Sequence, residues 1–133
     1  MPQENAEVVR AVLEAQRQRD WPAFRKLYDP EIEWEDVSGL WGDWGTQRGF
    51  ENVRDAFVTW FEAFEQVTFD IDSVLEAGED VVTSIRMSGR GRASGLLVDQ
   101  RVAVVWTVRG GRVARVRAYR DMPGALKAAG LRE

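Results

Sequence analysis

Three strand-like segments between residues 79 and 121 constrain the fold of this chain more than any other feature. They cover 81–92, 97–108 and 112–120. Ala93-Ser94-Gly95 separates the first segment from the second. Gly110-Gly111, between the second and the third, is a two-residue hairpin signal. We therefore expect a long antiparallel meander, one face of which the rest of the chain can cover.

The residues before the meander are predicted to form mainly helices. Apolar residues recur at three-to-four spacing over 4–19, and a second, shorter helix follows with Asp20 as its cap and Asp29-Pro30 at its end. The strongest helical pattern covers 50–64, residues 67–73 alternate as a strand, and a short helix over 122–129 ends the chain. These elements predict one α+β domain spanning residues 1–133.

The composition excludes several kinds of chemistry. The chain has no cysteine and no histidine, which rules out disulfides, thiolate nucleophiles and histidine bases and removes the commonest metal ligands. Carboxylates become the leading base candidates, and we expect no metal site. The sequence shows no signal peptide and no apolar run near the ~20 residues that span a bilayer, so we expect a cytoplasmic protein without membrane contact.

Arginines are concentrated on the predicted meander, whereas most acidic residues lie before residue 80. Basic stripes of this kind can bind nucleic acid. The net charge of -4 and the lack of a nucleic-acid motif instead favour arginines that pair with the acidic helices or with a second subunit. We therefore expect no nucleic-acid partner.

A short strand over 31–36 directs its side chains to two faces. Its three glutamates alternate outward, while Ile32, Trp34 and Asp36 share the opposite face. A carboxylate on an otherwise apolar face is partly desolvated, which makes Asp36 a candidate base for a proton next to a carbonyl. The alternative is that Asp36 caps the glycine-rich loop that follows, over 37–49.

Asp121 is the second candidate base, at the end of the last strand. It also precedes the terminal helix, and this context favours an N-cap. Alternation on the last strand puts Val116 and Ala118 on the helix-covered side and Arg117 and Tyr119 on the other side, unless a bulge redirects Tyr119.

The order of these elements, together with several motifs, resembles the NTF2-like superfamily, and more closely its SnoaL-like branch, which includes polyketide cyclases. The motifs are AFRKLYDPEIEW at 23–34, GFENVR at 49–54, GRGR at 89–92, VWT at 105–107 and the segment 111–121. The resemblance covers nearly the whole chain. It implies an NTF2-like cone, in which N-terminal helices pack on the concave face of a curved antiparallel sheet. It also implies a homodimer through the outer sheet face and a pocket that needs no cofactor.

The resemblance also bears on the two carboxylates. Glu35-Asp36-Val37 resembles the site where ketosteroid isomerases carry their catalytic carboxylate, at the end of the first strand. The polar partners of that carboxylate are replaced here by Val12 and by the apolar segment 103–106, so a strict ketosteroid isomerase is not expected. A cyclase requires only an acidic base, and the resemblance suggests one near the end of the last strand, where Asp121 lies.

Aromatic side chains are predicted to shape an apolar ligand pocket, consisting of Tyr28, Trp34, Trp41, Trp60, Trp106 and Tyr119. Two functions stay open. One is a cofactor-independent cyclase or isomerase that uses Asp36, or alternatively Asp121, as base on a small hydrophobic or polycyclic carbonyl compound. The other is a non-catalytic protein that binds a small hydrophobic ligand or serves as a dimeric scaffold.

Overall fold

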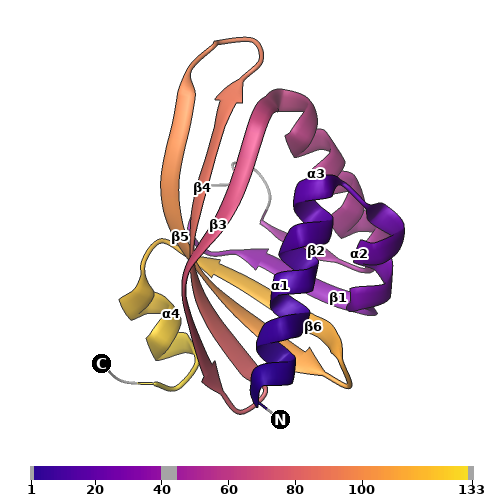
Figure 1. The fold of residues 1–133 in the computed structure, drawn as a ribbon, viewed down its shortest axis with the longest axis vertical. Coiled ribbons are helices and arrows are strands. Elements are labelled where there is room, and N and C mark those ends of the chain that lie inside the picture. Colours follow the sequence, from indigo (N-terminus) through magenta and orange to yellow (C-terminus); the bar gives the residue numbers. More distant parts are fainter. Residues whose placement is uncertain (1, 40–44, 132–133) are drawn as a thin grey trace.

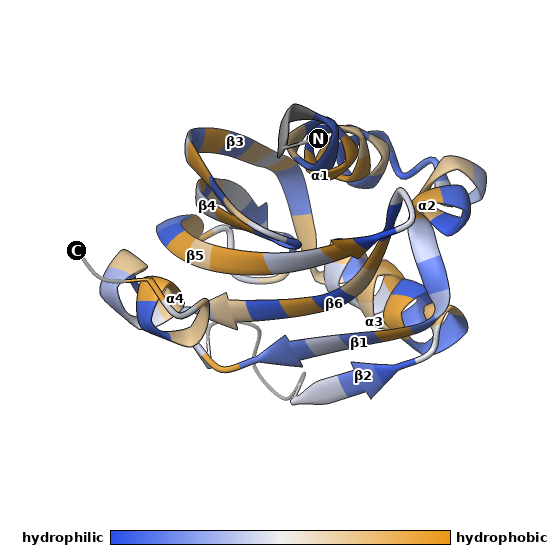
Figure 2. Cartoon of the chain, turned by 90° about the horizontal axis from the view of Figure 1, so that it is seen from below, coloured by the Kyte–Doolittle hydropathy of each residue, from blue (hydrophilic) through white to orange (hydrophobic). Residues whose placement is uncertain are grey.

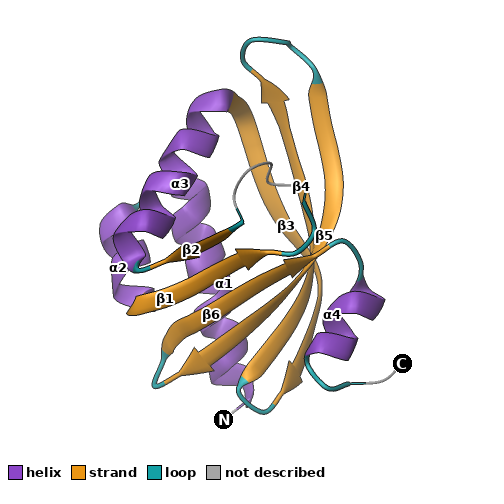
Figure 3. Ribbon diagram, turned by 180° about the vertical axis from the view of Figure 1, so that it is seen from behind, coloured by secondary structure: helices purple, strands orange, loops and turns teal. Residues whose placement is uncertain are grey.

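The protein consists of a six-stranded sheet with helices on both faces, as described for residues 2–39 and 45–131 by a computed structural model (Figure 1). Three helices, α1 (Pro2–Gln18), α2 (Trp21–Leu27) and α3 (Phe50–Ala63), cover one face, which we call the inner face. The short helix α4 (Met122–Ala128) lies on the opposite, outer face (Figure 3). The predicted α+β class, with N-terminal helices packed on a curved sheet, is confirmed.

The strands are arranged in the order β2-β1-β6-β5-β4-β3. Their bounds are β1 (Tyr28–Asp36), β2 (Thr46–Arg48), β3 (Phe64–Ala77), β4 (Asp80–Gly91), β5 (Leu97–Arg109) and β6 (Arg112–Tyr119). The predicted meander corresponds to β4, β5 and β6, which pair antiparallel. One pairing departs from the antiparallel prediction, because β1 and β6 run parallel, with Trp34 beside Val116. Parallel neighbours need a long connection, and the chain from residue 37 to 111 provides it.

The hairpin between β5 and β6 follows its sequence signal. Gly110 and Gly111 have φ values of 58° and 76°, and Arg109 pairs with Arg112 across them. Two successive residues with positive φ are what a type I′ turn requires, and this turn matches the twist of the paired strands. The predicted two-residue turn is therefore confirmed.

Two predicted boundaries near β1 are wrong. The second helix ends at Leu27, and Tyr28 is already extended, with φ −103° and ψ 142°. Proline disfavours helical backbone in the residue before it, so Pro30 excludes Asp29 from the helix, and the helix already ends before Tyr28. Within the predicted loop over 37–49, the strand β2 pairs antiparallel with β1. Its sequence, Thr46-Gln47-Arg48, has no apolar alternation that could have revealed it.

β3 is longer than predicted and is bent by bulges. It spans 14 residues, and its register with β4 shifts between Glu65 and Thr68 and again between Ile71 and Ser73. Gln66, within the first shift, has a left-handed φ of 55°. Extra residues of this kind bend a strand and increase its twist, so they contribute to the curvature of the sheet.

Two hydrophobic clusters hold the layers together. The larger lies between α1, α2, α3 and the inner face, and the smaller lies between α4 and the outer face. β5 contributes to both, with Trp106 in the larger cluster and Val105 in the smaller one. Hydrophobic colour accordingly runs along β5 in Figure 2. A strand covered on both faces reads as a continuous apolar run, which explains the sequence Val102-Ala103-Val104-Val105-Trp106.

Many meander arginines pair with acids of the same sheet. Arg86 lies 2.6 Å from Asp99, and Arg101 lies 2.8 Å from Asp72. For these two arginines the acidic partner is therefore on a strand of the same sheet, β5 for Arg86 and β3 for Arg101, and not on a helix. In the part of the chain that the structure describes, no helix is both long and apolar enough to cross a membrane.

Candidate ligand-binding site

Aromatic rings from three elements meet around Tyr28, the first residue of β1. The Tyr28 ring centroid lies 4.4 Å from that of Phe24 on α2 and 6.1 Å from that of Phe50 on α3. Farther along β1, Trp34 meets Phe57 of α3 at a centroid distance of 5.9 Å, nearly edge to face. All five side chains are buried. The inner face of β1 therefore carries an aromatic cluster (Phe24, Tyr28, Trp34, Phe50 and Phe57).

The Tyr28 hydroxyl is the unusual group in this cluster. It has no accessible surface and no hydrogen-bond partner among residues 2–39 and 45–131. Burial raises the pKa of this hydroxyl far above its usual range. The Trp34 indole lies close enough to favour the ionised form, but the two groups do not meet in hydrogen-bond geometry. A buried donor without a partner is uncommon, because each one costs about 1–3 kcal/mol.

Asp36 lies half-buried at the end of β1, where it holds the start of the next loop. Its Oδ1 accepts hydrogen bonds from the Ser38 amide at 3.0 Å, the Gly39 amide at 3.2 Å and the Ser38 hydroxyl. The Asp36 amide donates to the Gly45 carbonyl at 2.8 Å. The loop-cap role predicted as the alternative for Asp36 is therefore present in the structure.

Asp121 forms the predicted N-cap of α4. Its Oδ1 accepts a hydrogen bond of 2.9 Å from the Gly124 amide, and the side chain is exposed. Because α4 packs on the outer face, this cap lies on the side of the sheet away from Tyr28. The structure therefore does not bring Asp121 together with the inner aromatic cluster.

The other predicted pocket residues are divided between the two faces. Trp106 is buried on the inner face, and Trp60 stacks near the start of β3, 4.7 Å from Phe64 between ring centroids. Tyr119 packs on the outer face with α4. Trp41 and the neighbouring Trp44 lie outside the described residues.

The predicted alternation on β6 is confirmed. Val116 and Ala118 are fully buried on the inner face, whereas Arg117 and Tyr119 point to the outer face. The Arg117 side chain is only 12% exposed, and its Nη2 lies 3.8 Å from Oδ2 of Asp80. The helical pattern over 122–129 does not show which face of the sheet α4 covers, so it does not predict the burial of Arg117.

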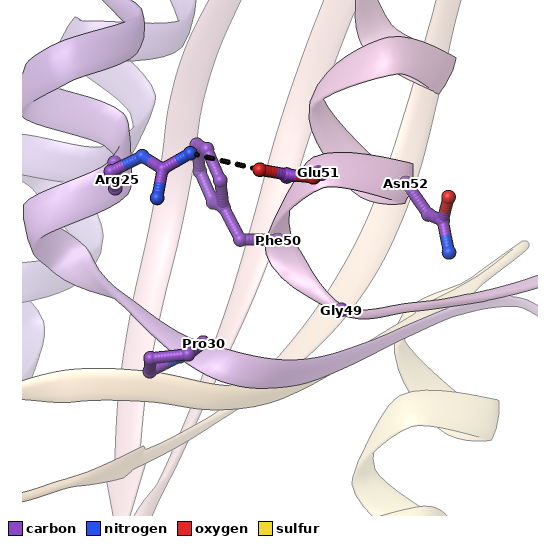
Figure 4. Close-up of a pocket in the computed structure, with 6 residues that line it drawn as sticks. All are labelled: Arg25, Pro30, Gly49, Phe50, Glu51 and Asn52. Carbon is purple, nitrogen blue, oxygen red and sulfur yellow. Dashed lines mark hydrogen bonds and ion pairs between the residues drawn. The ribbon is translucent and has the colours of Figure 1, made fainter.

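A surface pocket of about 400 Å³ lies outside the aromatic cluster and was missed by sequence reasoning. Figure 4 shows Arg25 and Glu51 meeting beside the Phe50 ring, while Asn52 points away from them. The Arg25 guanidinium lies 4.9 Å from the Phe50 ring centroid. Phe50 belongs to the inner aromatic cluster and contacts Tyr28, so its ring lies between this pocket and the rest of the cluster.

Metal binding has no evident site in the described part of the chain. Among residues 2–39 and 45–131, no group of three or more acidic side chains is placed to hold a metal ion. The chemistry available to the described site is therefore that of aromatic rings, one buried phenol and the loop-bound carboxylate of Asp36.

Comparisons with known proteins place this architecture among characterised folds. The profile of the SnoaL-like domain matches residues 9–116. A candidate SnoaL-like polyketide cyclase from Jannaschia sp. CCS1 has a similar structure, with 19% identity, a TM-score of 0.79 and coverage of 99% of this chain and 95% of that chain. A search of curated protein sequences found no significant match to the chain.

Two further similar structures hold small molecules. A protein with the ketosteroid isomerase-like fold from Catenulispora acidiphila DSM 44928 was crystallised with trimethylamine, at 20% identity, TM-score 0.75 and coverage of 95% of this chain and 94% of that chain. TerC was co-crystallised with polyporic acid, at 19% identity, TM-score 0.77 and coverage of 96% and 98%. At these identities the likeness concerns the fold.

Proposed function

The chain belongs to the SnoaL-like domain family and has the NTF2-like fold, and on that premise we propose that it binds a small apolar molecule through the inner aromatic cluster. In this proposal the Tyr28 hydroxyl donates a hydrogen bond to an oxygen of the ligand. The ring system of the ligand packs against the aromatic side chains that surround Tyr28. Binding, rather than turnover, is the function that the geometry supports best.

The observation that carries the proposal is the Tyr28 hydroxyl, which is buried without a partner among the described residues. A ligand carbonyl beside Tyr28 would accept a hydrogen bond from the hydroxyl. Part of the free-energy cost of burying the hydroxyl would therefore be recovered on binding. The surrounding rings favour a flat, apolar ligand. A polycyclic carbonyl compound combines both properties.

The similar structures support this choice of function without fixing the ligand. Two of them were crystallised with small organic molecules, trimethylamine in one case and polyporic acid in the other. The engagement of Asp36 by its own loop supports binding further, because one carboxylate oxygen already accepts three hydrogen bonds there.

Calorimetric titration with 2-hydroxy-1,4-naphthoquinone tests the proposal, using wild type, Tyr28→Phe and Tyr119→Phe. The Tyr28→Phe variant should bind about 2- to 10-fold more weakly, because one hydrogen bond contributes about 0.5–1.5 kcal/mol. Tyr119→Phe is the matched control, since it removes a hydroxyl from the opposite face. Absence of binding to wild type, or an equal effect of both substitutions, would refute the proposed site.

A second candidate function is cofactor-independent carbon-acid chemistry, a cyclisation or isomerisation with Asp36 as base. The observation that favours it is the position of Asp36, half-buried two residues after Trp34 at the end of β1. In such a reaction the carboxylate would take a proton from the carbon next to a carbonyl and return it to another position. Asp121 is the alternative base in this candidate.

Proton exchange provides a test of this chemistry that needs no knowledge of the substrate. The bicyclic ketone 2-tetralone is incubated with the protein in D₂O, and loss of its α-proton signals is followed by NMR. Carbon-acid catalysis predicts faster exchange with wild type and background exchange with Asp36→Asn, whose amide oxygen can still cap the loop. Loss of exchange in Asp121→Asn alone would transfer the role to Asp121, and wild-type exchange at the background rate counts against catalysis.

The assembly and location expected from the sequence belong to the same proposal. We propose a cytoplasmic homodimer that uses the part of the outer face not covered by α4, where Arg86 and Arg101 lie about half or more exposed. Light scattering after gel filtration measures the mass in solution. A monomer at micromolar concentration would remove the dimer from the proposal.

A further inference from the structure

We propose a second ligand site, separate from the inner aromatic cluster, that takes a small aromatic carboxylate. A cavity of about 390 Å³ opens where the turn between α1 and α2 meets α3 and the loop after β4. It is lined by Arg19, Trp21, Val58, Phe61, Glu62 and Arg92. The proposal goes beyond the binding function proposed above and does not depend on it.

Phe61 separates this cavity from the protein interior. On its inner side the Phe61 ring packs against Phe57 and Phe69, at centroid distances of 6.4 and 6.2 Å. On the cavity side it lies 6.2 Å from the ring of Trp21. Trp21 is half-buried and Val58 is 36% exposed, so both leave apolar surface open at the cavity. This wall suits a flat ring system.

The charges at the cavity favour an anion. The Arg19 guanidinium lies 4.5 Å from the Phe61 ring centroid, and it forms no ion pair with any residue in 2–39 or 45–131. Arg92 pairs only loosely with Glu65, at 3.9 Å, and both side chains are about half exposed. Against these two guanidiniums, the lining residues include a single carboxylate, that of Glu62. Guanidinium groups are well suited to carboxylates, which they bind through paired N–H donors.

Arg19 occupies a backbone position with positive φ that usually holds glycine, which points to a role for its side chain. Arg19 follows the last turn of α1 with a left-handed φ of 56°, and its amide bonds to the Gln16 carbonyl at 3.1 Å. The next amide, of Asp20, reaches the Ala15 carbonyl at 2.9 Å, which completes a Schellman cap. Glycine is the usual residue at this position because it adopts φ > 0 without strain. An arginine here carries strain that glycine would not, and its guanidinium lies at the cavity.

These features define the ligand by its chemistry. A ring system of one or two rings would lie against Trp21 and Val58, with its carboxylate toward Arg19 and Arg92. The cavity volume is within the range of small-molecule sites, and the combination of an apolar wall with a few charged groups is typical of them.

Calorimetric titration with 2-naphthoate and its neutral isostere 2-naphthamide tests the proposal on the whole chain. We expect 2-naphthoate to bind at least 10-fold more tightly than the amide and to weaken as salt is raised. Arg19→Gly should reduce the affinity for 2-naphthoate at least 5-fold while the protein stays folded, because glycine suits the local backbone. Arg92→Gln provides a second variant, and Arg25→Gln, in the pocket of Figure 4, is the matched control.

Three results would overturn the second site. They are equal affinities for 2-naphthoate and 2-naphthamide, an unchanged affinity in both Arg19→Gly and Arg92→Gln, and a loss of 2-naphthoate binding in Tyr28→Phe. The last result would assign this ligand to the inner cluster instead. A shift of the Trp21 indole N–H resonance on addition of 2-naphthoate would support the site directly.

Discussion

The indole N–H of Trp106 donates a hydrogen bond of 2.9 Å to the hydroxyl of Thr83 on the neighbouring strand. Both side chains are buried, with exposures of 2% and 0%. The pair therefore satisfies two polar groups within an apolar layer. Tyr28 contrasts with it, because its equally buried hydroxyl has no such partner among the described residues.

Thr83→Val should destabilise the protein by about 1–3 kcal/mol, because it leaves the Trp106 indole N–H buried without an acceptor. Thr83→Ser keeps the hydroxyl and should cost clearly less. Urea unfolding followed by far-UV circular dichroism measures both values. Equal losses in the two variants would mean that the methyl group of Thr83, and not its hydroxyl, stabilises the sheet.

Tyr28→Phe should stabilise the ligand-free protein by about 1 kcal/mol at pH 7. The substitution keeps the ring contacts with Phe24 and Phe50 and removes a buried hydroxyl that has no partner among the described residues. Urea midpoints of wild type and variant give the difference. A destabilised variant would show that the hydroxyl is hydrogen-bonded in the free protein, which would weaken the proposed ligand contact as well.

The same substitution should change the response to alkaline pH. Burial raises the pKa of Tyr28 in the folded state, so above pH ~10 the unfolded chain loses this proton while the folded protein keeps it. The unfolded state then binds fewer protons, and wild-type stability should fall by up to about 1.4 kcal/mol per pH unit from this group. Tyr28→Phe lacks this contribution, so its advantage over wild type should widen between pH 9 and 11. A constant difference across that range would contradict the burial of the phenol.

The arrangement of the sheet was largely predictable from the sequence, because local signals defined it. The Gly110-Gly111 turn and the alternation around Val116 and Arg117 gave the right register and faces. The parallel pairing of β1 with β6 was not predictable, since it depends on contacts between segments about 80 residues apart. The unbroken apolar run 102–106 indicates that β5 is covered on both faces, and α4 covers the outer one.

The candidate site was predictable only in part. Alternation correctly put Ile32 and Trp34 on the inner face, but it could not orient the carboxylate of Asp36, which the amides of Ser38 and Gly39 control. The spacing of Tyr28 from Phe24 predicts a helix at Tyr28, whereas this residue begins β1. The lack of a partner for its hydroxyl among residues 2–39 and 45–131 depends on how β1, α2 and α3 pack together, which no local sequence pattern contains.

Asp121→Ala should destabilise the protein by about 1 kcal/mol, because it removes the acceptor of the Gly124 amide at the start of α4. Asp121→Asn should be nearly neutral, since asparagine is an equally good N-cap. Thermal unfolding of the two variants measures the difference. Because α4 and the inner aromatic cluster lie on opposite faces of the sheet, neither change should alter the affinity for 2-hydroxy-1,4-naphthoquinone.

Asp36→Ala and Asp36→Asn together separate the two roles considered for this carboxylate. Alanine removes the acceptor of the Ser38 and Gly39 amides, so we expect a loss of about 1–2 kcal/mol and faster amide hydrogen exchange at both residues. Asparagine keeps an oxygen at the same place, and its loss should be well below that of alanine. Amide exchange by NMR and urea unfolding are the measurements.

The result for Asp36→Asn also decides whether capping the loop is the only role of the Asp36 carboxylate. If the asparagine variant is as unstable as the alanine variant, the negative charge, and not only the acceptor geometry, holds the loop. If asparagine preserves stability and ligand affinity but abolishes α-proton exchange on 2-tetralone, the carboxylate acts on the substrate in addition to capping. Full retention of all three properties leaves the cap as the role of Asp36, since a base cannot be replaced by a neutral amide.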